Sequence, residues 1–388
     1  MDTTLGGSGD QALTFTAYFS GVMQISQSIG SVPFQLFKRE GEMKRRPWIE
    51  HPVYNILNNM ANPWANSLKW RETAEEQCIN YGNSYSYIVR DTSSRPKEVY
   101  LLDTTRMKVE VKDSGEPVYL YTRKNGKQKR YTPDEIFNLI GFGPDMYTGY
   151  SMIELHRKAI KLGLNQQDFS NAFIDNGVAT SGVATHPGQI KQEAYERLRD
   201  DLEKRNAGAR NAGKILIFEE GMTFQTMTMP LKDAEFLGSK VFQIQEIARI
   251  LNIPPHKLKD LSRATFSNIE HQQIEFVTDT MRPWAERWES AANTQLLSKI
   301  ERKKGFTEHD LNALMRGDMK TLYESQRIGR FAGLTNANEG RFKLGMNPVD
   351  GDDIGQRYWQ PSNMLDASSD MAAGIAPPEP IESTGETT

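Results

Sequence analysis

The sequence of 388 residues contains one cysteine, Cys78, and this scarcity excludes an internal disulfide and any metal site built from several thiolates. Such a chain suits a reducing compartment such as a cytoplasm. We interpret Cys78 as a small buried hydrophobic side chain. Long apolar runs are lacking too, since no stretch reaches about 18 uninterrupted apolar residues, and the N-terminal segment has no basic region before an apolar run. The sequence therefore predicts neither a membrane span nor a visible export signal.

The chain also lacks an excess of positive charge. It has 47 Lys and Arg against 50 Asp and Glu, a net charge of -3 and a pI near 6.2. A protein that binds nucleic acid through one broad basic face is therefore not indicated, although local basic patches remain possible. The length predicts two or three domains. The mean hydropathy of -0.61 indicates a large polar surface, which fits a multi-part protein.

Sequence motifs that carry catalytic chemistry are missing. The chain has no GxxxxGK[ST] loop, no HExxH pair and no GxSxG elbow. The glycine-rich stretch GFGPDMYTGYS at 141–151 lacks the spacing of a dinucleotide-binding loop, so a phosphate site there is disfavoured. Asp350, Asp352 and Asp353 resemble a cation loop only loosely, because the distant bidentate glutamate of an EF-hand is absent. The sequence thus predicts no enzyme active site, no cofactor and no bound metal.

Hydrophobic periodicity and turn residues predict an α+β chain whose first half mixes helices with antiparallel hairpins. Gly82 is the expected stop between a helix and a strand, and Asn125-Gly126 is the expected turn of one hairpin. The expected elements are helices at 11–29 and 67–81, helical turns around Asn62-Pro63, strands at 33–39 and 85–90, and hairpins within 85–131. Five cations flank the Asn-Gly turn, and we interpret them as a solvated hairpin tip rather than a nucleic-acid patch: Arg123, Lys124, Lys127, Lys129 and Arg130.

Long helices dominate the middle of the chain. Ser151 and Glu154 have capping-box spacing, which predicts a helix over 151–176, with a mild interruption at Gly163. A small strand, helix, strand, strand module is expected over 177–230. A second long helix follows, and its apolar residues recur at spacings of three and four. That stripe predicts a helix-packing seam, either in the core or between subunits: Leu237, Val241, Ile244, Ala248 and Leu251.

A polar loop without a catalytic set follows that helix, in the stretch IPPHKLKDLSRATFSNIEHQQIEF at 253–276. Its two prolines end the helix, because proline donates no amide and restricts the residue before it. The capping-box spacing in SNIE predicts that a new helix begins near 269 and runs to about 305, with a kink or break at Pro283. Trp284 and Trp288 lie one turn apart on this helix, and we interpret them as packing anchors.

The C-terminal part is expected to be helical over 306–360. From residue 361 to 388 the chain has few large apolar side chains and no Lys or Arg, which predicts a disordered acidic tail. Long helices that bracket a small module and lead into a polar loop, with no catalytic constellation, favour a mechanical or assembly role.

Six stretches occur in order along nearly the whole chain: HPVYNILNNMANPWANSLKWRE, CINYGNSYSYIVRD, MYTGYSMIELHRKAI, IARILNIPPHKLKD, ATFSNIEHQQIEFVTDTMRPW and LTNANEGRFKLGMNPVDGDD. Each is weak alone, but the ordered set resembles the portal proteins of tailed bacteriophages, specifically the HK97-like portal family. The resemblance implies a ring of identical subunits, usually a dodecamer, at one capsid vertex of the virion. Double-stranded DNA would enter and leave through its axial channel, and the ring would assemble in the host bacterial cytoplasm.

The resemblance also implies a division of the chain into functional parts. These are a wing (1–150 and 269–305), two stem helices (151–176 and 231–255), a clip (177–230), a tunnel loop (256–268) and a crown (306–360). In this family the clip docks the packaging terminase and later the head-completion and tail-connector proteins, while the capsid protein and scaffold are further partners. The candidate docking charges are Lys204, Arg205, Arg210 and Lys214. The tunnel loop projects into the channel, where the candidate DNA-facing residues are Lys257, Lys259, Arg263, Thr265 and Ser267.

Alternatives remain open at this point. The cations of the loop and of the clip could serve ordinary solvation or ion pairs between subunits. A different ring-forming head-tail connector is the nearest rival function. An enzyme rival is a metal-dependent nuclease or terminase-like protein that uses the aspartates at 350, 352 and 353. A monomeric DNA-binding module is disfavoured by the charge balance.

Overall fold

A computed structural model shows the chain as two compact units, Met1–Met315 and Arg316–Thr388. The residues that the structure describes are 8–41, 44–175, 182–185, 187–188, 192, 195–197, 222–226, 233–260, 272–315, 319–344, 346–349 and 353–358. No helix within these ranges has both the length and the apolar character needed to cross a membrane.

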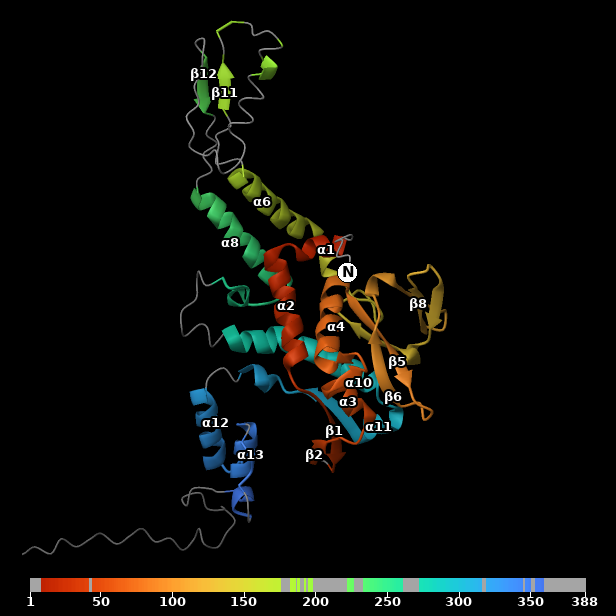
Figure 1. Ribbon diagram of the computed structural model, residues 1–388. Coiled ribbons are helices and arrows are strands. Elements are labelled where there is room, and N and C mark those ends of the chain that lie inside the picture. Colours follow the sequence, from red (N-terminus) through yellow and green to blue (C-terminus); the bar gives the residue numbers. More distant parts are fainter. Residues whose placement is uncertain are drawn as a thin grey trace, which may run out of the picture. The chain divides into compact units, whose positions relative to one another are not determined.

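The first unit combines helices with small antiparallel sheets, which confirms the α+β class (Figure 1). In the described part of the chain the strand orders are β13-β1-β2, β10-β5-β6, β7-β8-β9, β3-β4 and β11-β12. The strands are β1 Phe34–Glu40, β2 Lys44–Pro47, β3 Met60–Asn62, β4 Ala65–Asn66, β5 Asn83–Arg90, β6 Pro96–Leu101, β7 Met107–Val111, β8 Pro117–Thr122, β9 Gln128–Tyr131, β10 Ile136–Ile140, β11 Gly182–Thr185, β12 Thr223–Thr226 and β13 Gly305–His309.

The helices of this unit are α1 Ser8–Leu13, α2 Thr16–Ser31, α3 Pro52–Asn58, α4 Ser67–Tyr81, α5 Met152–Leu155, α6 Arg157–Asp175, α8 Asp233–Ile250, α10 Arg282–Gln295 and α11 Lys299–Lys304. Short helical turns are η1 Thr104–Arg106, η2 Pro133–Glu135, η4 Pro255–Leu258, the π-helix η5 Phe276–Met281 and η6 Leu311–Met315. The second unit contains α12 Met319–Phe331, α13 Ala337–Lys343 and η7 Asp353–Gln356. A capping box at Asn336 and Glu339 starts α13.

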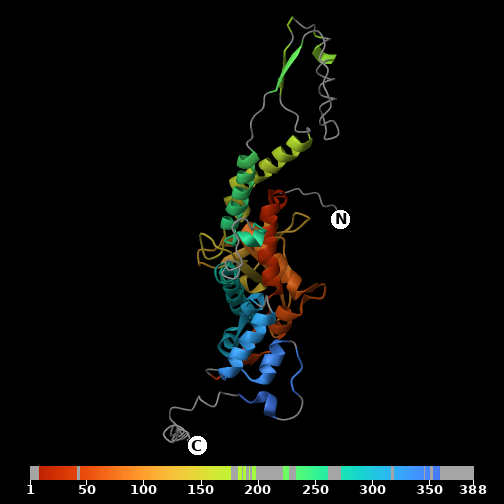
Figure 2. The same cartoon turned by 90° about the vertical axis from the view of Figure 1, so that its left-hand side faces the viewer.

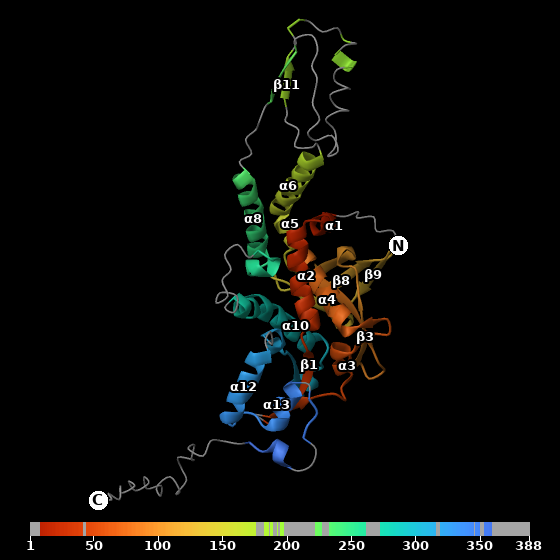
Figure 3. The same ribbon diagram turned by 60° about the vertical axis from the view of Figure 1, so that its left-hand side comes forward.

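One buried core joins α2, α4 and α10, and α2 lies beside α4 (Figure 3). Trp288 of α10 is fully buried, and its ring meets that of Trp70 edge to face at 5.3 Å and that of Phe34 at 6.3 Å. The predicted packing role of Trp288 is confirmed, and Trp284 packs at the margin of the same core. Cys78 is buried here as well, as the sequence predicts.

The carboxyl group of Glu75 is buried in this core and accepts a hydrogen bond of 2.7 Å from the Trp288 indole. Burial raises its pKa to about 8, although the Trp288 bond and the charge of Arg287 lower it. The folded protein therefore holds Glu75 protonated at neutral pH, whereas the unfolded chain releases the proton above its ordinary pKa of 4.5. Folding stability should consequently fall as the pH rises from about 4.5 towards 8.

We expect Glu75→Gln to remove this pH dependence, because the amide stays neutral and still offers an acceptor to Trp288. The free energy of unfolding should rise by on the order of 2 kcal/mol at pH 8 and change little at pH 5. Urea unfolding at the two pH values measures the difference. An equal change at both pH values would contradict a buried neutral carboxyl.

Several sequence-based boundaries in the first 90 residues are corrected. The helix expected over 11–29 is two helices, α1 and α2. The helical turns expected around Asn62-Pro63 are wrong, because the β3-β4 hairpin lies there. The Asn62 side-chain oxygen accepts hydrogen bonds of 3.0 Å from the amides of Trp64 and Ala65, which closes a turn instead of a helix. The helix predicted over 67–81 and its stop at Gly82 are confirmed.

Two of the long helices that the sequence predicts, over 151–176 and over 269–305, are divided into shorter segments. The first is broken at His156 into α5 and α6. Gly163 does not interrupt α6; it leaves room for the ring of Phe15, which a β-carbon there would overlap. Residues 269–271 of the helix expected over 269–305 lie outside the described residues, and the rest is helical from 272 and continues as the π-helix η5, α10 and α11. Pro283 lies in the first turn of α10 directly after the π-helix, and the chain is helical on both sides of it.

Three further strands were missed: β2, where a basic turn was expected, and β10 and β13, whose partners are more distant in sequence. β10 pairs with β5, and β13 pairs with β1 across roughly 270 residues of chain. The expectation that the chain is helical from Phe306 onward is therefore wrong for Phe306–His309, since Phe306 lies opposite Phe37 in the sheet.

Candidate functional site

The two predicted stem helices correspond to α6 and α8, which lie side by side (Figure 2). The Gln166 amide donates a hydrogen bond to the Ser239 hydroxyl between them. The predicted seam on α8 is partly used within the subunit, because Ala248 and Leu251 are buried and Ile244 packs against the same core. Val241 is half-buried, and the side chain of Leu237 lies outside the described residues.

A stripe of partly exposed apolar side chains runs along α5 and α6. Leu155, Leu162 and Phe169 recur every seven residues, and their exposed fractions are 58%, 56% and 50%. Leu162 and Phe169 both lie on α6, where residues seven apart share nearly the same face and are about 10 Å apart along the axis, whereas Leu155 ends α5 before the break at His156. Exposed apolar patches of this kind mark interaction surfaces.

Past α8 the chain turns sharply and is fixed to the helix that follows the loop. Asn252 adopts a positive φ of 51°, and its side-chain amide donates a 3.0 Å hydrogen bond to the carbonyl of Asp279. The Thr280 hydroxyl donates to the carbonyl of Asn252 at 2.5 Å. The start of the loop at 253 is thereby tied to η5, which lies on the far side of the loop in sequence.

α2 supports the same turn through Gly21. A β-carbon at this position would overlap the Leu251 side chain and lie 3.1 Å from that of Ile253 and 3.4 Å from that of Leu258. All three side chains are buried. The close approach of these side chains, and not the backbone conformation, requires glycine here, because Gly21 lies in ordinary α-helix. This contact holds the root of the loop against the core.

Lys257 lies at this root and does not present a free charge. Its ammonium group is half-buried, donates a 2.5 Å hydrogen bond to Gln273 and lies 4.5 Å from the ring centroid of Phe276. Burial lowers the pKa of Lys257, and the charge of Lys259 lowers it further. Gln273 in turn donates to the carbonyl of Leu314 at 3.0 Å. Lys257 thus joins the two ends of the loop.

Lys259 differs from its neighbour, because its side chain is exposed and its backbone, with a φ of 64°, ends η4. The other predicted DNA-facing residues, Arg263, Thr265 and Ser267, lie outside the described residues. A cleft of about 410 Å³ opens beside this root, between the end of α8 and the helical residues from 272 onward. Its polar lining includes His256, Gln272 and Glu275.

The glycine-rich stretch at 141–151 has a packing role. The amide of Gly141 donates to the carbonyl of Gly82 at 2.8 Å, and Gly149 lies so close to Gly82 that a β-carbon on either would overlap the other's carbonyl oxygen. The Ser151 hydroxyl donates to the carbonyl of Asn80 at 2.7 Å. The stretch is therefore fastened to the end of α4, and it sets where α5 begins.

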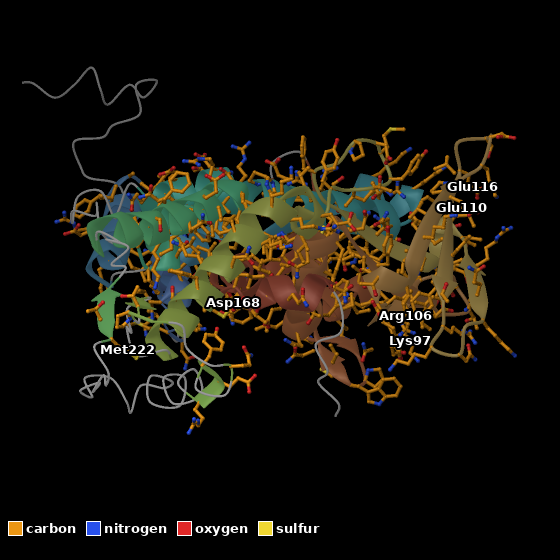
Figure 4. The ribbon with its side chains drawn as sticks, turned by 90° about the horizontal axis from the view of Figure 1, so that it is seen from above. Lys97, Arg106, Glu110, Glu116, Asp168 and Met222 are labelled. Carbon is orange, nitrogen blue, oxygen red and sulfur yellow. The ribbon has the colours of Figure 1, made fainter. Side chains whose placement is uncertain are left out.

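The predicted clip is described only in part. β11 pairs with β12 in antiparallel register, and Figure 4 labels Met222 beside β12 and Asp168 on α6. The four candidate docking charges, from Lys204 to Lys214, lie outside the described residues.

In the part of the chain that the structure describes, no group of three or more His, Cys, Asp or Glu side chains could hold a metal ion. Asp350 and Asp352 fall outside that part, and Asp353 begins η7.

These features define an α+β subunit with two paired helices and with exposed apolar side chains on one of them, which is typical of a protein that assembles with other subunits. The family model described as "Phage portal protein" matches residues 16–345. The chain belongs to the phage portal protein family, as the resemblance in the sequence predicts.

Known relatives agree with this assignment. The chain is 25% identical to the portal protein of Enterobacteria phage HK97 over 354 residues, which cover 90% of this chain and 83% of that protein. It is 26% identical to the probable portal protein of Streptomyces phage phiC31 over 375 residues, covering 91% and 79%. Among solved structures, the neck of an empty gene transfer agent (GTA) particle with C6 symmetry matches with a TM-score of 0.59 and 26% identity, over 85% of this chain and 90% of that chain.

Proposed function

We propose that twelve copies of this chain form a closed ring at one vertex of a phage capsid, and that double-stranded DNA is packaged and released through its axial channel. The observation that carries this proposal is the portal family match over residues 16–345. The rotational symmetry of the particle neck to which the chain is similar supports a ring.

The stripe that contains the exposed side chains of Leu155 and Leu162 supports the ring from the subunit itself. A ring uses a heterologous interface, in which one surface of each copy meets a different surface of the next. The stripe supplies one such surface, and Phe242, which is 55% exposed on α8, belongs to the helix that would face it. The two stem helices would then pack within one subunit and also between neighbours.

The loop over 256–268 would line the channel. In this proposal Lys257 fixes the loop's root through Gln273, while Lys259 and Arg263 supply the charges that meet phosphates without regard to sequence. Thr265 and Ser267 would add hydroxyl contacts. Twelve copies would repeat these weak contacts around the DNA. Because the chain as a whole is negatively charged, the duplex would not bind tightly and could still slide.

We expect Lys259→Gln combined with Arg263→Gln to leave the ring intact and to lower the fraction of DNA-filled heads about tenfold, because each copy loses two phosphate contacts. The fraction is measured by gradient sedimentation of capsids assembled with the variant. Lys124→Gln combined with Lys127→Gln, at the hairpin tip, removes the same charge elsewhere and should fill heads normally. Normal filling with both pairs would remove the channel role of the loop cations.

The remaining partners follow from the portal role. The clip over 177–230, with Lys204, Arg205, Arg210 and Lys214, would dock the terminase and later the head-completion and tail-connector proteins, and the capsid protein and scaffold would contact the ring. The chain itself would perform no catalysis. A magnesium-dependent DNA cleavage assay checks this point: cleavage that disappears when the aspartates at 350, 352 and 353 become alanine would favour the nuclease alternative.

A further inference from the structure

The outer face of the β13-β1-β2 sheet gathers arginines and aromatic rings. In the antiparallel register Phe37 lies opposite Phe306, and Arg39 lies opposite Arg45. Side chains alternate between the two faces of a strand, so these four share one face. The alternate residues of β1, Phe34 and Leu36, are fully buried on the core side. We call the outer set of Phe37, Arg39, Arg45 and Phe306 the arginine platform.

The platform holds its guanidinium groups against the two rings. The ring centroids of Phe37 and Phe306 are 5.9 Å apart. The guanidinium carbon of Arg39 lies 5.0 Å from the Phe306 centroid, and that of Arg45 lies 4.8 Å from the Phe37 centroid. Stacking of this kind restrains a guanidinium group and leaves its N–H edges available for bidentate hydrogen bonds. The arginine side chains are thus preorganised although they are solvent-exposed.

Charge at the platform is concentrated and incompletely compensated. Residues 38–50 and 299–308 together carry nine Lys or Arg and five Glu, whereas the whole chain has a net charge of -3. Like charges directly opposite each other in a sheet are destabilising, and Arg39 opposes Arg45. The last turn of α11, which runs straight into β13, adds Arg302, Lys303 and Lys304.

Four of the five carboxylates in these segments are already engaged, and the fifth, Glu42, lies outside the described residues. Glu308 pairs with Arg45, and both Glu40 and Glu50 pair with Arg46. Glu301 accepts from His51 at 3.0 Å. Among the described residues, no carboxylate lies within ion-pair distance of Arg39, Lys44 or Lys304, cations from three different elements. The surface therefore has positive charge available to a polyanion.

We propose that the arginine platform binds the phosphate backbone of double-stranded DNA, at a second contact separate from the tunnel loop. This inference rests on the proposed function, which makes DNA the polyanion that the ring meets. The guanidinium groups partly cover both phenyl rings, so the face offers donors and charge rather than an apolar pocket, which fits a phosphodiester backbone better than peptide side chains. Binding would also relieve the repulsion between Arg39 and Arg45.

The test measures the affinity of the full-length protein for a labelled 20-base-pair duplex over a range of NaCl concentrations. Arg39→Gln combined with Arg45→Gln should raise Kd about tenfold and reduce the slope of log K against log salt by about 2, because each lost phosphate contact changes it by roughly 0.9. Arg39→Lys combined with Arg45→Lys keeps the charge but loses the stacked fork, and should give an intermediate Kd. Lys124→Gln combined with Lys127→Gln is the matched charge control and should leave both quantities unchanged.

The melting temperature with and without DNA shows whether a change in Kd results from misfolding of a variant. The duplex should raise the Tm of the wild-type protein and should raise that of the Arg→Gln variant much less, each compared with its own Tm without DNA, because the variant also loses the Arg45–Glu308 ion pair and the two ring contacts. An unchanged Kd and slope in the Arg→Gln variant overturn the proposal. Competition by polyglutamate as effective as that by DNA assigns the platform to an acidic protein and likewise overturns it.

The same preparations separate this inference from the proposed function. The mass of the assembled particle is measured for the wild type and for each variant. If the protein forms a normal ring and its DNA affinity does not change when the two arginines are replaced, only the proposal for the arginine platform is wrong. Wild-type protein that never forms a ring defeats the portal function, whatever the platform binds.

Discussion

Replacing Gly82 by alanine is expected to destabilise the protein by about 4 kcal/mol, the range of effects that single substitutions reach only through a named defect. Gly82 ends α4 with a φ of +87°, where a side chain is strained. In addition, a β-carbon there would overlap the carbonyl oxygen of Gly149 and lie 2.5 Å from its carbon. These atoms are backbone, so they yield only if the whole stretch at 141–151 moves away from α4.

The controls for this prediction are Gly115→Ala and Gly126→Ala. Both glycines have a similar positive φ, 82° and 78°, but an added β-carbon would have no atom within 4 Å. Each should cost about 1 kcal/mol, which is the backbone strain alone. Urea unfolding of the three variants separates strain from close approach. A loss for Gly82→Ala no larger than that of the controls would show that the stretch at 141–151 is not fastened to α4.

Replacing Arg71 by methionine is expected to have a comparable effect, on the order of 4 kcal/mol. Arg71 is 5% exposed, and its guanidinium donates to the carbonyls of Ile29, Gly30 and Val32 at 3.1, 2.8 and 2.7 Å. These carbonyls end α2, where no amide of the helix can reach them and where a cation also suits the helix dipole. Methionine fills similar space but leaves the three acceptors buried without donors.

Arg71→Lys provides the graded comparison. Lysine keeps a charge and three donors but lacks the planar fork, so its loss of stability should fall between zero and that of methionine. Thermal unfolding of both variants measures the order. If Arg71→Met is as stable as the wild type, the bonds to the end of α2 contribute little, and α4 must be held against α2 by packing alone.

Caps, glycine stops and turn residues predicted correctly those elements whose bounds depend on residues nearby in the sequence. The helix α4 and its stop at Gly82 were predicted correctly, and the structure shows that the Asn66 side chain caps its start. The β7-β8-β9 hairpins were found because glycine turns separate alternating strands. Ser151 was correctly predicted to cap a helix, and its hydroxyl accepts from the amide of Glu154 at 3.1 Å.

Contacts distant in sequence escaped prediction. No sequence pattern near Phe306 indicates that it pairs with Phe37, so the arginine platform could not be predicted from neighbouring residues. The partner of Lys257, Gln273, lies beyond the loop, and the sequence alone therefore presented Lys257 as a free cation. Gly21 offered a weak clue, since an isolated glycine inside an amphipathic helix often has a packing reason. Its actual neighbours, Leu251, Ile253 and Leu258, could be known only from the fold.

The family assignment has a different basis, because it depends on an ordered set of motifs rather than on any one contact. The motifs span wing, stem, loop and crown as the resemblance divides them. The structure adds what the motifs do: GNSYSYIVR is a central strand that contacts α4, and MYTGYSMIEL fastens the start of α5 to the end of α4. Those roles are structural, which explains why no catalytic pattern accompanies them.

The central claim is that this chain works as a closed ring, and its most direct test is the mass and symmetry of the purified protein. Native mass spectrometry together with negative-stain class averages gives both. The account predicts a closed ring of twelve 44.1 kDa subunits with an axial hole. It also predicts that Leu155→Asp combined with Leu162→Asp, on the stripe, releases folded monomers. A wild-type protein that stays monomeric even in the presence of the proposed scaffold and capsid partners would contradict the account.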